Sequence, residues 1–295
     1  MEYKVSKIDK EYDFTVYGTS FIGNPRDNTI LFVTAKVERM LEKLEDCKEC
    51  LVFAEKGLEI PESLKARNCF IMVDDPQLEY AYLAVEIAKE EKRKNQERKY
   101  TLTEGGYYLG ENVTLGRNCF IEPGCRIGHD VVIGDNAYIR FGSTICNAVI
   151  GNDFACSEYS CIGIDSFYMS EGEKSFRIPS FGKVIIKDNV DVSCNVIIER
   201  GFISDTIIGN NNKFDSAVII GHDSCLGDNV VVTSETSVAG LVNIGDDAYI
   251  GMNSTVKQFV NIGANALIGM GTNVVADVPE GITVVGNPAR EMKRK

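Results

Sequence analysis

Large apolar residues recur at every sixth position over much of the C-terminal two thirds of the chain. A period of six fits neither an α-helix nor a single strand, but it is typical of a parallel β-helix. Each hexad then supplies one short strand and one corner, and three hexads complete a triangular coil of 18 residues. Glycine often follows the apolar residue, and we expect it to let the corner turn tightly. The longest uninterrupted run has twelve members: Ile208, Phe214, Ile220, Leu226, Val232, Val238, Ile244, Ile250, Val256, Ile262, Ile268 and Val274.

The same period begins near Leu109 and is broken in three places. It slips by one residue before Ile150, stops over residues 163–182, and slips again after Ile198. We therefore predict a β-helix over residues 105–278 with a loop insertion at 163–182. A loop of this length with four aromatic residues suggests a functional lid or a subunit contact, and the alternative is a spare surface loop.

The first 104 residues do not repeat and predict a small α/β domain. Segments 13–17, 29–33, 50–54 and 69–73 are rich in β-branched or aromatic residues and predict strands. A helical pattern lies between the second and third of them. Asp75 and Pro76 mark the start of a second helix, which runs into a basic stretch at 89–99 that we interpret as a solvated helix end. Residues 279–295 form a tail that breaks the repeat.

Composition excludes several classes of protein. The formal net charge of −12 argues against a nucleic-acid partner and against an anionic membrane. No apolar run approaches 18 residues and no secretory signal is present, so we expect a cytoplasmic protein without membrane insertion. The ten cysteines lack zinc spacing and are interpreted as reduced, small apolar residues.

His222 is the first candidate for chemistry. It lies at a predicted corner, and an 18-residue coil places Gly240 directly beside it on the next coil. An imidazole next to a bare backbone N–H suits acyl transfer, because the histidine accepts a proton and the N–H stabilises an oxyanion. The alternative is an ordinary surface histidine at a turn. Asp215 and Asp223 are both candidates for the carboxylate that supports the imidazole.

The remaining chemistry is more limited. His129 occupies the same hexad position as His222, but its surroundings favour a surface role. Two histidines are too few for the three-histidine zinc site known in this kind of fold, so we predict no metal. No G-x-S-x-G motif is present, which favours direct transfer between two bound substrates over a covalent intermediate.

The hexads resemble those of the left-handed β-helix acyltransferases. The motifs I-D-S-F-Y, R-I-P-S-F-G-K-V-I-I and I-I-E-R-G between residues 163 and 201, followed by K-F-D-S-A-V-I-I-G-H-D, are similar to the UDP-3-O-acylglucosamine N-acyltransferases of lipid A biosynthesis. The V-D-D-P-Q-L helix start is similar to the nucleotide-binding domain of that family. The resemblance implies an α/β N-terminal domain followed by an all-β left-handed parallel β-helix, assembled as a homotrimer.

The resemblance also implies residue roles. His222 would be the general base, Asp215 its support, and the Gly240 N–H part of the oxyanion hole. Further residues expected at the substrate are Asp165, Phe167, Tyr168, Arg177 and Asp223, with the loop closing over the sugar. Where this family carries a phenylalanine that stacks on uracil and a nearby asparagine, this chain has Leu31 and Thr34.

The C-terminal V-V-G-N-P-A-R differs from that family and is similar to sugar acetyltransferases that use coenzyme A. Residues expected near the cofactor are Gly240, Lys257, Asn287, Arg290 and Lys293. Our first hypothesis is therefore transfer of an acyl group from acyl-CoA, a co-substrate rather than a tightly bound cofactor, to the amine of a nucleotide-linked amino sugar. The alternatives are an acyl carrier protein-dependent lipid A enzyme and a non-catalytic nucleotide-sugar binder.

Overall fold

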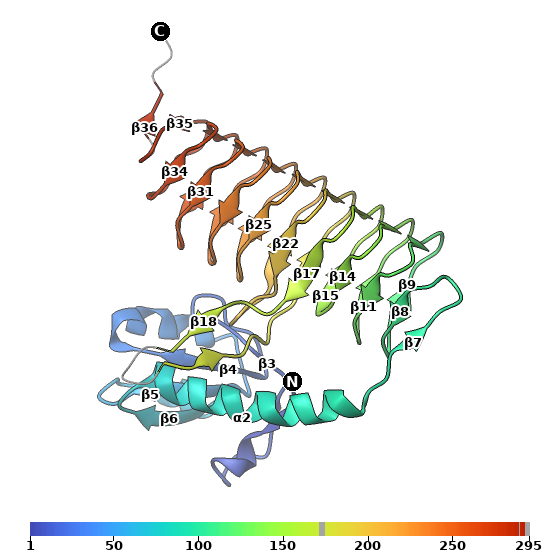
Figure 1. Cartoon of the computed structure of the whole chain (residues 1–295). Helices are drawn as coiled ribbons and strands as arrows, with labels where there is room; N and C mark the ends of the chain where they lie inside the picture. The colour runs from blue at the N-terminus through green and yellow to red at the C-terminus, as the bar shows by residue number, and fades with distance from the viewer. Residues whose placement is uncertain (171–174, 289, 293–295) are drawn as a thin grey trace. The chain divides into compact units, whose positions relative to one another are not determined.

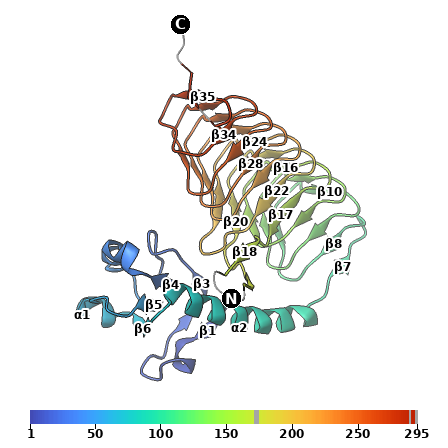
Figure 2. The ribbon, with the colours of Figure 1, turned by 60° about the vertical axis from the view of Figure 1, so that its left-hand side comes forward.

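The computed structural model describes residues 1–170, 175–288 and 290–292, and divides the chain into two compact units (Figures 1 and 2). The N-terminal unit comprises Met1–Glu97 and Phe167–Phe181. The β-helix unit comprises Arg98–Ser166 and Gly182–Lys295. Among the described residues, no helix has both the length and the hydrophobicity needed to cross a membrane.

The N-terminal unit is built on a four-stranded parallel sheet in the order β3-β4-β5-β6. The predicted strands at 29–33 and 69–73 are confirmed, and the one at 50–54 is shifted by one residue. The predicted strand at 13–17 is reduced to two residues in a separate antiparallel pair. The strands are β1 (Tyr3–Lys4), β2 (Thr15–Val16), β3 (Gly18–Thr19), β4 (Thr29–Val33), β5 (Leu51–Glu55) and β6 (Cys69–Val73).

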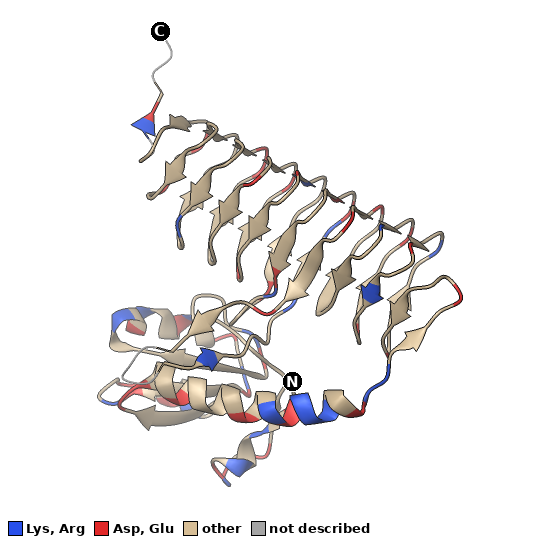
Figure 3. Ribbon diagram, in the orientation of Figure 1, with Lys and Arg blue, Asp and Glu red and all other residues tan. Residues whose placement is uncertain are grey.

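The helices in the described part of this unit are η1 (Val5–Lys7), η2 (Ala35–Leu44), α1 (Glu62–Lys65) and α2 (Pro76–Glu97). Helix α2 begins where the sequence predicts, because Asp75 Oδ1 accepts a hydrogen bond from Leu78 N at 3.0 Å. The basic stretch lies on the exposed second half of α2, interleaved with glutamates (Figure 3), and Lys94 pairs with Glu90 at 3.5 Å.

The β-helix unit has three long sheets, whose strands follow one another in turn around each coil (Figure 1). All their pairings are parallel except those of β7 and β36 at the two ends. Sheet I contains β10 (Phe120–Ile121), β13 (Tyr138–Ile139), β16 (Ala155–Cys156), β21 (Asp191–Val192), β24 (Lys213–Phe214), β27 (Val231–Val232), β30 (Tyr249–Ile250), β33 (Leu267–Ile268), β35 (Thr283–Val285) and β36 (Arg290–Glu291).

Sheet II contains β7 (Thr101–Leu102), β8 (Tyr108–Leu109), β11 (Arg126–Ile127), β14 (Thr144–Ile145), β17 (Cys161–Ile164), β22 (Ile197–Glu199), β25 (Ile219–Ile220), β28 (Ser237–Val238), β31 (Thr255–Val256) and β34 (Asn273–Val274). Sheet III contains β9 (Thr114–Leu115), β12 (Val132–Ile133), β15 (Ala148–Ile150), β20 (Val184–Ile186), β23 (Thr206–Ile208), β26 (Cys225–Leu226), β29 (Asn243–Ile244) and β32 (Asn261–Ile262). The core inside these sheets consists mainly of the apolar hexad residues, as predicted.

The glycines after the apolar residues have a different role from the one expected. The left-handed backbone at a corner falls two residues further on, as at Asp223 with φ 56°. Gly221 instead lies against the next coil, where an added Cβ would be 2.6 Å from the carbonyl carbon of Ala239. The glycine is therefore needed for the close approach of successive coils rather than for the turn.

Both ends of the predicted β-helix domain need correction. The unit begins at Arg98 rather than at residue 105, because the Arg98 guanidinium makes two hydrogen bonds to Asp130, at 2.5 and 3.0 Å. The predicted tail also contributes to the coils. Val284 takes an interior position and pairs with Ile268, and β36 then folds back along β35.

The insertion at 163–182 also differs from the prediction. Two of its segments form the antiparallel strands β18 (Tyr168–Met169) and β19 (Arg177–Ile178), which belong to the N-terminal unit. Phe176 stacks on Tyr82 of α2 with ring centroids 5.5 Å apart and an interplanar angle of 13°. The described residues 167–170 and 175–181 of the predicted loop are therefore part of the N-terminal unit, where β19 packs on α2, whereas residues 163–166 and 182 belong to the β-helix unit.

Candidate functional site

His222 and Asp223 form a buried pair at the corner that follows β25. His222 Nδ1 lies 2.7 Å from Asp223 Oδ2, and the residues are 8% and 5% exposed. The ring of Phe202 meets the imidazole edge to face at a centroid distance of 6.2 Å. A carboxylate accepts hydrogen bonds only, so the neutral imidazole carries its proton on Nδ1 and leaves Nε2 as a proton acceptor.

The Asp223 carboxylate is held by backbone donors. Oδ2 accepts from Phe202 N at 2.8 Å, and Oδ1 accepts from Ile203 N at 3.1 Å and Ser204 N at 2.6 Å. The Ser204 hydroxyl donates a further bond to Oδ1 at 2.9 Å. Burial alone raises the pKa of this carboxyl, but the hydrogen bonds from His222 and the loop outweigh burial and lower the pKa below the usual aspartate value.

Gly240 lies one coil beyond His222, as the 18-residue repeat predicts. Ile220 in β25 pairs with Val238 in β28, which brings residue 240 over residue 222. A Cβ on Gly240 would lie 2.5 Å from His222 Nε2, so the missing side chain leaves room at the reactive nitrogen. Among the described residues, the Gly240 N–H donates to no acceptor. A proton acceptor and an uncommitted backbone donor thus meet at one point, the combination that acyl transfer requires.

Asp215 does not support the imidazole in the way we expected. Its carboxylate accepts from Ser216 N at 2.7 Å and from the Ser234 hydroxyl. The physical reason is the geometry of the coil: Asp215 follows β24 of sheet I, whereas His222 follows β25 of sheet II. Of the two carboxylates that the sequence left open, Asp223 is the one paired with His222.

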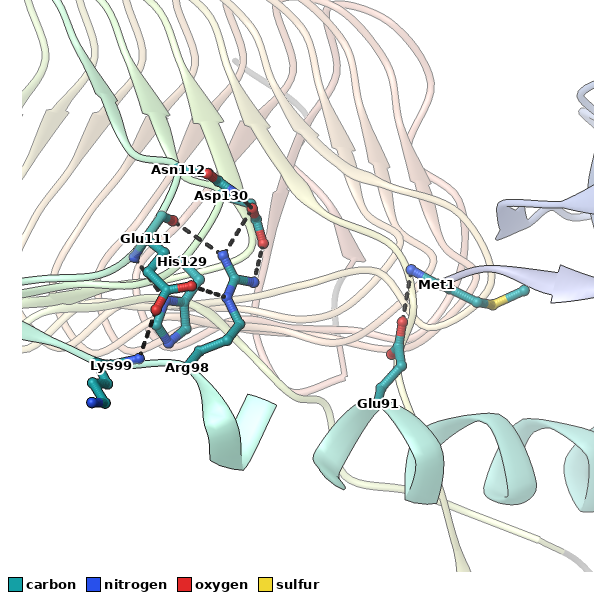
Figure 4. A network of polar contacts seen from close by, with 8 residues as sticks. All are labelled: Met1, Glu91, Arg98, Lys99, Glu111, Asn112, His129 and Asp130. Carbon is teal, nitrogen blue, oxygen red and sulfur yellow. Dashed lines mark hydrogen bonds and ion pairs between the residues drawn. The ribbon is translucent and has the colours of Figure 1, made fainter. Parts of the chain in front are cut away.

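The Nδ1 atom of His129 accepts a hydrogen bond, whereas that of His222 donates one, although both residues occupy the same hexad position. His129 Nδ1 accepts from Glu111 N at 2.8 Å, inside a network that also contains Arg98 and Asp130 (Figure 4). The Tyr100 ring packs on the imidazole at 4.5 Å. Burial and the nearby Arg98 lower the pKa of His129. His129 therefore joins successive coils, as Asp and Asn side chains do at other corners.

The other expected substrate residues fall in two groups. Phe167, Tyr168 and Arg177 lie together at the paired strands β18 and β19 of the N-terminal unit, and the Arg177 guanidinium is 5.6 Å from the centre of the Phe167 ring. Asp165 belongs to the β-helix unit and pairs with Arg200 at 3.4 Å.

The expected cofactor residues lie along the last coils. Lys257 is exposed and follows β31, one coil beyond Ala239. Asn287 Oδ1 accepts from Asn273 Nδ2 at 3.4 Å, and Arg290 lies in β36. Gly240 is thus next to His222, whereas Asn287 and Arg290 are two or more coils away. Lys293 lies outside the described residues.

Sequence reasoning missed Phe202, Ile203, Ser204 and Thr206. Thr206 Oγ1 accepts from Asp223 N at 2.9 Å and completes the enclosure of the pair. A signal was available, because the register slip after Ile198 shows that extra residues enter the coil next to His222. The slip does not reveal that these residues turn their N–H groups toward Asp223.

We expect Asp223→Asn to lower the free energy of unfolding by about 2 kcal/mol near neutral pH, because an amide presents N–H groups to N–H donors. The ionised carboxylate has a lowered pKa in the folded state. It therefore contributes stability that is complete above the ordinary aspartate pKa of about 3.9, and that is lost as the pH falls through the lowered folded value. Denaturant unfolding of both proteins between pH 7 and acid pH checks this. A difference that stays constant below pH 4 would contradict it.

Residues 112–147 match the family described as bacterial transferase hexapeptide (six repeats). A UDP-3-O-acylglucosamine N-acyltransferase from Caulobacter vibrioides (strain NA1000 / CB15N) is 49% identical over 148 residues, which are 50% of this chain and 44% of the relative. The protein of the same name from Agrobacterium fabrum (strain C58 / ATCC 33970) is 50% identical over 147 residues, which are 50% of this chain and 41% of the relative. The chain thus spans less than half the length of these curated relatives.

Solved structures with the same fold include the UDP-N-acetylglucosamine O-acyltransferase from Moraxella catarrhalis RH4, with 26% identity and a TM-score of 0.60 over 65% of this chain and 74% of that one. The Francisella novicida UDP-N-acetylglucosamine acyltransferase has 30% identity and a TM-score of 0.58 over 64% and 69%. The α/β region followed by a left-handed β-helix is therefore confirmed. This chain is a left-handed β-helix, hexapeptide-repeat protein that resembles the UDP-3-O-acylglucosamine N-acyltransferases.

Proposed function

We propose that this protein transfers an acyl group to the amine of a nucleotide-linked amino sugar. The observation that carries the proposal is the buried His222–Asp223 pair, whose Nε2 lies beside Gly240 and its uncommitted backbone N–H. The resemblance to N-acyltransferases of a UDP-linked glucosamine supports the acceptor class.

In this proposal the sugar amine attacks the carbonyl carbon of an acyl thioester and forms a C–N bond. His222 Nε2 takes the proton that the amine loses, and Asp223 stabilises the resulting imidazolium. The Gly240 N–H donates to the oxyanion of the tetrahedral intermediate. When the C–S bond breaks, the imidazolium returns its proton to the departing thiolate. No covalent enzyme intermediate is needed.

The names of the relatives favour UDP-3-O-acylglucosamine as the acceptor. They support the acceptor of our alternative, the lipid A reaction, better than the other amino sugar of our first hypothesis, and they do not specify the acyl donor. The homotrimer and the role of the N-terminal unit in holding the nucleotide remain predictions.

One structural observation supports the alternative in which acyl-CoA is the donor. Leu31, at the place where the resembled family has a base-stacking phenylalanine, is 0% exposed and belongs to the core of the N-terminal unit. It therefore offers no surface on which a uracil could stack. Together with the C-terminal V-V-G-N-P-A-R, this is the basis of the alternative with a different nucleotide and a coenzyme A donor.

An assay that combines each acceptor with each donor distinguishes the lipid A reaction from the acyl-CoA alternative. The protein is incubated with UDP-3-O-acylglucosamine or with a panel of UDP- and dTDP-linked amino sugars, each with acyl-acyl carrier protein or acyl-CoA, and the products are identified by mass spectrometry. We expect an N-acylated product from UDP-3-O-acylglucosamine and the carrier-protein donor. Product only with acyl-CoA and another sugar would support the alternative. Binding without any acyl transfer would support a non-catalytic nucleotide-sugar binder.

A further inference from the structure

The coil before His222 is longer than those that follow it. Ile198 pairs with Ile220, 22 residues further on, whereas Ile220 pairs with Val238 after 18. The four extra residues fall between the end of β22 at Glu199 and the start of β23 at Thr206. We call residues 201–205 the inserted corner.

The inserted corner turns toward Asp223. Its consecutive N–H groups at Phe202, Ile203 and Ser204 all donate to that carboxylate, and the Ser204 hydroxyl adds a fourth bond. Successive N–H groups arranged in this way form a concave anion-binding site. The anion here is the side chain of Asp223 itself, which is 0% exposed.

Close contacts fix the shape of the inserted corner. Arg200 Nε donates to Gly182 O at 2.6 Å, and Gly182 N donates to Gly201 O at 3.0 Å. A Cβ on Gly182 would lie 1.6 Å from the Ser204 carbonyl oxygen, so only glycine fits there. The corner is therefore held from outside, and its N–H groups keep their direction without help from a substrate.

We propose that the inserted corner is a positioning device for the base. Its four donors hold the Asp223 carboxylate at Nδ1 of His222, and that contact fixes the neutral imidazole as the Nδ1–H tautomer, with Nε2 at the space beside Gly240. Ser204 and Phe202 are positioning residues, because they act through Asp223 and the imidazole rather than on a substrate. The catalytic consequence rests on the proposed function, whereas the effect on the imidazole does not.

The two histidines provide a direct readout. His222 donates from Nδ1 to Asp223, whereas His129 accepts at Nδ1 from Glu111 N. Their neutral rings must therefore be opposite tautomers. Long-range ¹H–¹⁵N NMR of protein labelled in histidine should show one ring protonated at Nδ1 and one protonated at Nε2, with His129 as the internal reference.

Ser204→Ala is the first variant. It removes the hydroxyl bond and keeps the N–H, so we expect kcat to fall about 3- to 10-fold with KM unchanged. The His222 Nδ1 proton resonance should move, while the His129 signals stay in place. Ser204→Thr retains a hydroxyl and should restore both readouts. Ser143→Ala removes another buried hydroxyl, which donates to Ser157 O at 2.8 Å, and should change neither.

Deletion of residues 201–204 is the second variant, because it returns this coil to the 18-residue repeat. We expect kcat to fall at least ~10-fold and His222 to populate both tautomers. If the deletion variant does not fold, the results for Ser204→Ala alone test the proposal. An unchanged kcat with an unmoved His222 resonance would overturn the proposal, and so would a lower kcat with an unmoved resonance, since the corner would then act by another route. An inactive wild-type protein with the expected NMR behaviour would refute only the proposed function.

Discussion

Replacing His222 with alanine is expected to lower the turnover of acyl transfer by at least ~100-fold, the usual size of the effect when a general base is lost. No other described imidazole can substitute, because His129 has its Nδ1 committed to Glu111 N at another corner of the β-helix. Asp223 cannot replace the base either, since its carboxylate is buried and bound by three N–H groups.

The fold should tolerate this substitution. Asp223 loses one partner but keeps its four donors from the inserted corner, so the carboxylate is not left uncompensated. The measurement is kcat with saturating substrates, together with denaturant unfolding to confirm that the variant is folded. His129→Asn is the matched control, because asparagine supplies the same kind of corner acceptor that Asp228 provides to Asn210 N. Turnover of His222→Ala within ~3-fold of wild type would remove His222 from the mechanism.

The architecture followed from the sequence because a solenoid is locally determined. Each apolar hexad residue enters the interior independently of distant contacts, so a period of six is enough to place residues such as Ile220 and Val238 in register. The same reasoning failed where chain segments leave the repeat. Nothing in the period shows that the insertion returns to α2, or that Val284 resumes the coil beyond Pro279.

The candidate site was likewise predictable only where it depends on the repeat. Gly240 follows from His222 by the coil length alone. The choice between Asp215 and Asp223 did not follow, because it depends on which sheet each residue follows and on where the inserted corner sends its N–H groups. Those directions are set by tertiary contacts, such as the one between Gly182 and Ser204, that no local pattern encodes.

Gly240→Ala is expected to lower kcat by about 100-fold or more while leaving the protein folded. The added Cβ would lie 2.5 Å from His222 Nε2, closer than van der Waals contact permits. The imidazole must then rotate away from both Asp223 and the substrate. An off-rotamer side chain costs about 0.5–1.5 kcal/mol. A glycine replaced by alanine at a compatible backbone contributes about 0.4–1 kcal/mol in the opposite direction. The lost hydrogen bond to the Asp223 carboxylate costs about 1.5–3 kcal/mol more. The free energy of unfolding should therefore fall by about 1–4 kcal/mol.

A double-mutant cycle separates this clash from any other effect of the methyl group. In a His222→Ala background the imidazole is absent, so adding Gly240→Ala should stabilise the protein by about 0.4–1 kcal/mol instead of straining it. Its effect on kcat should also disappear, because the step it impairs has already been lost. Gly18→Ala is a suitable control, since a Cβ there meets only the Thr29 methyl at an ordinary 3.9 Å. If Gly240→Ala lowers kcat equally in both backgrounds, the residue acts independently of His222, and the geometry that places the N–H and the base at one reaction centre is wrong.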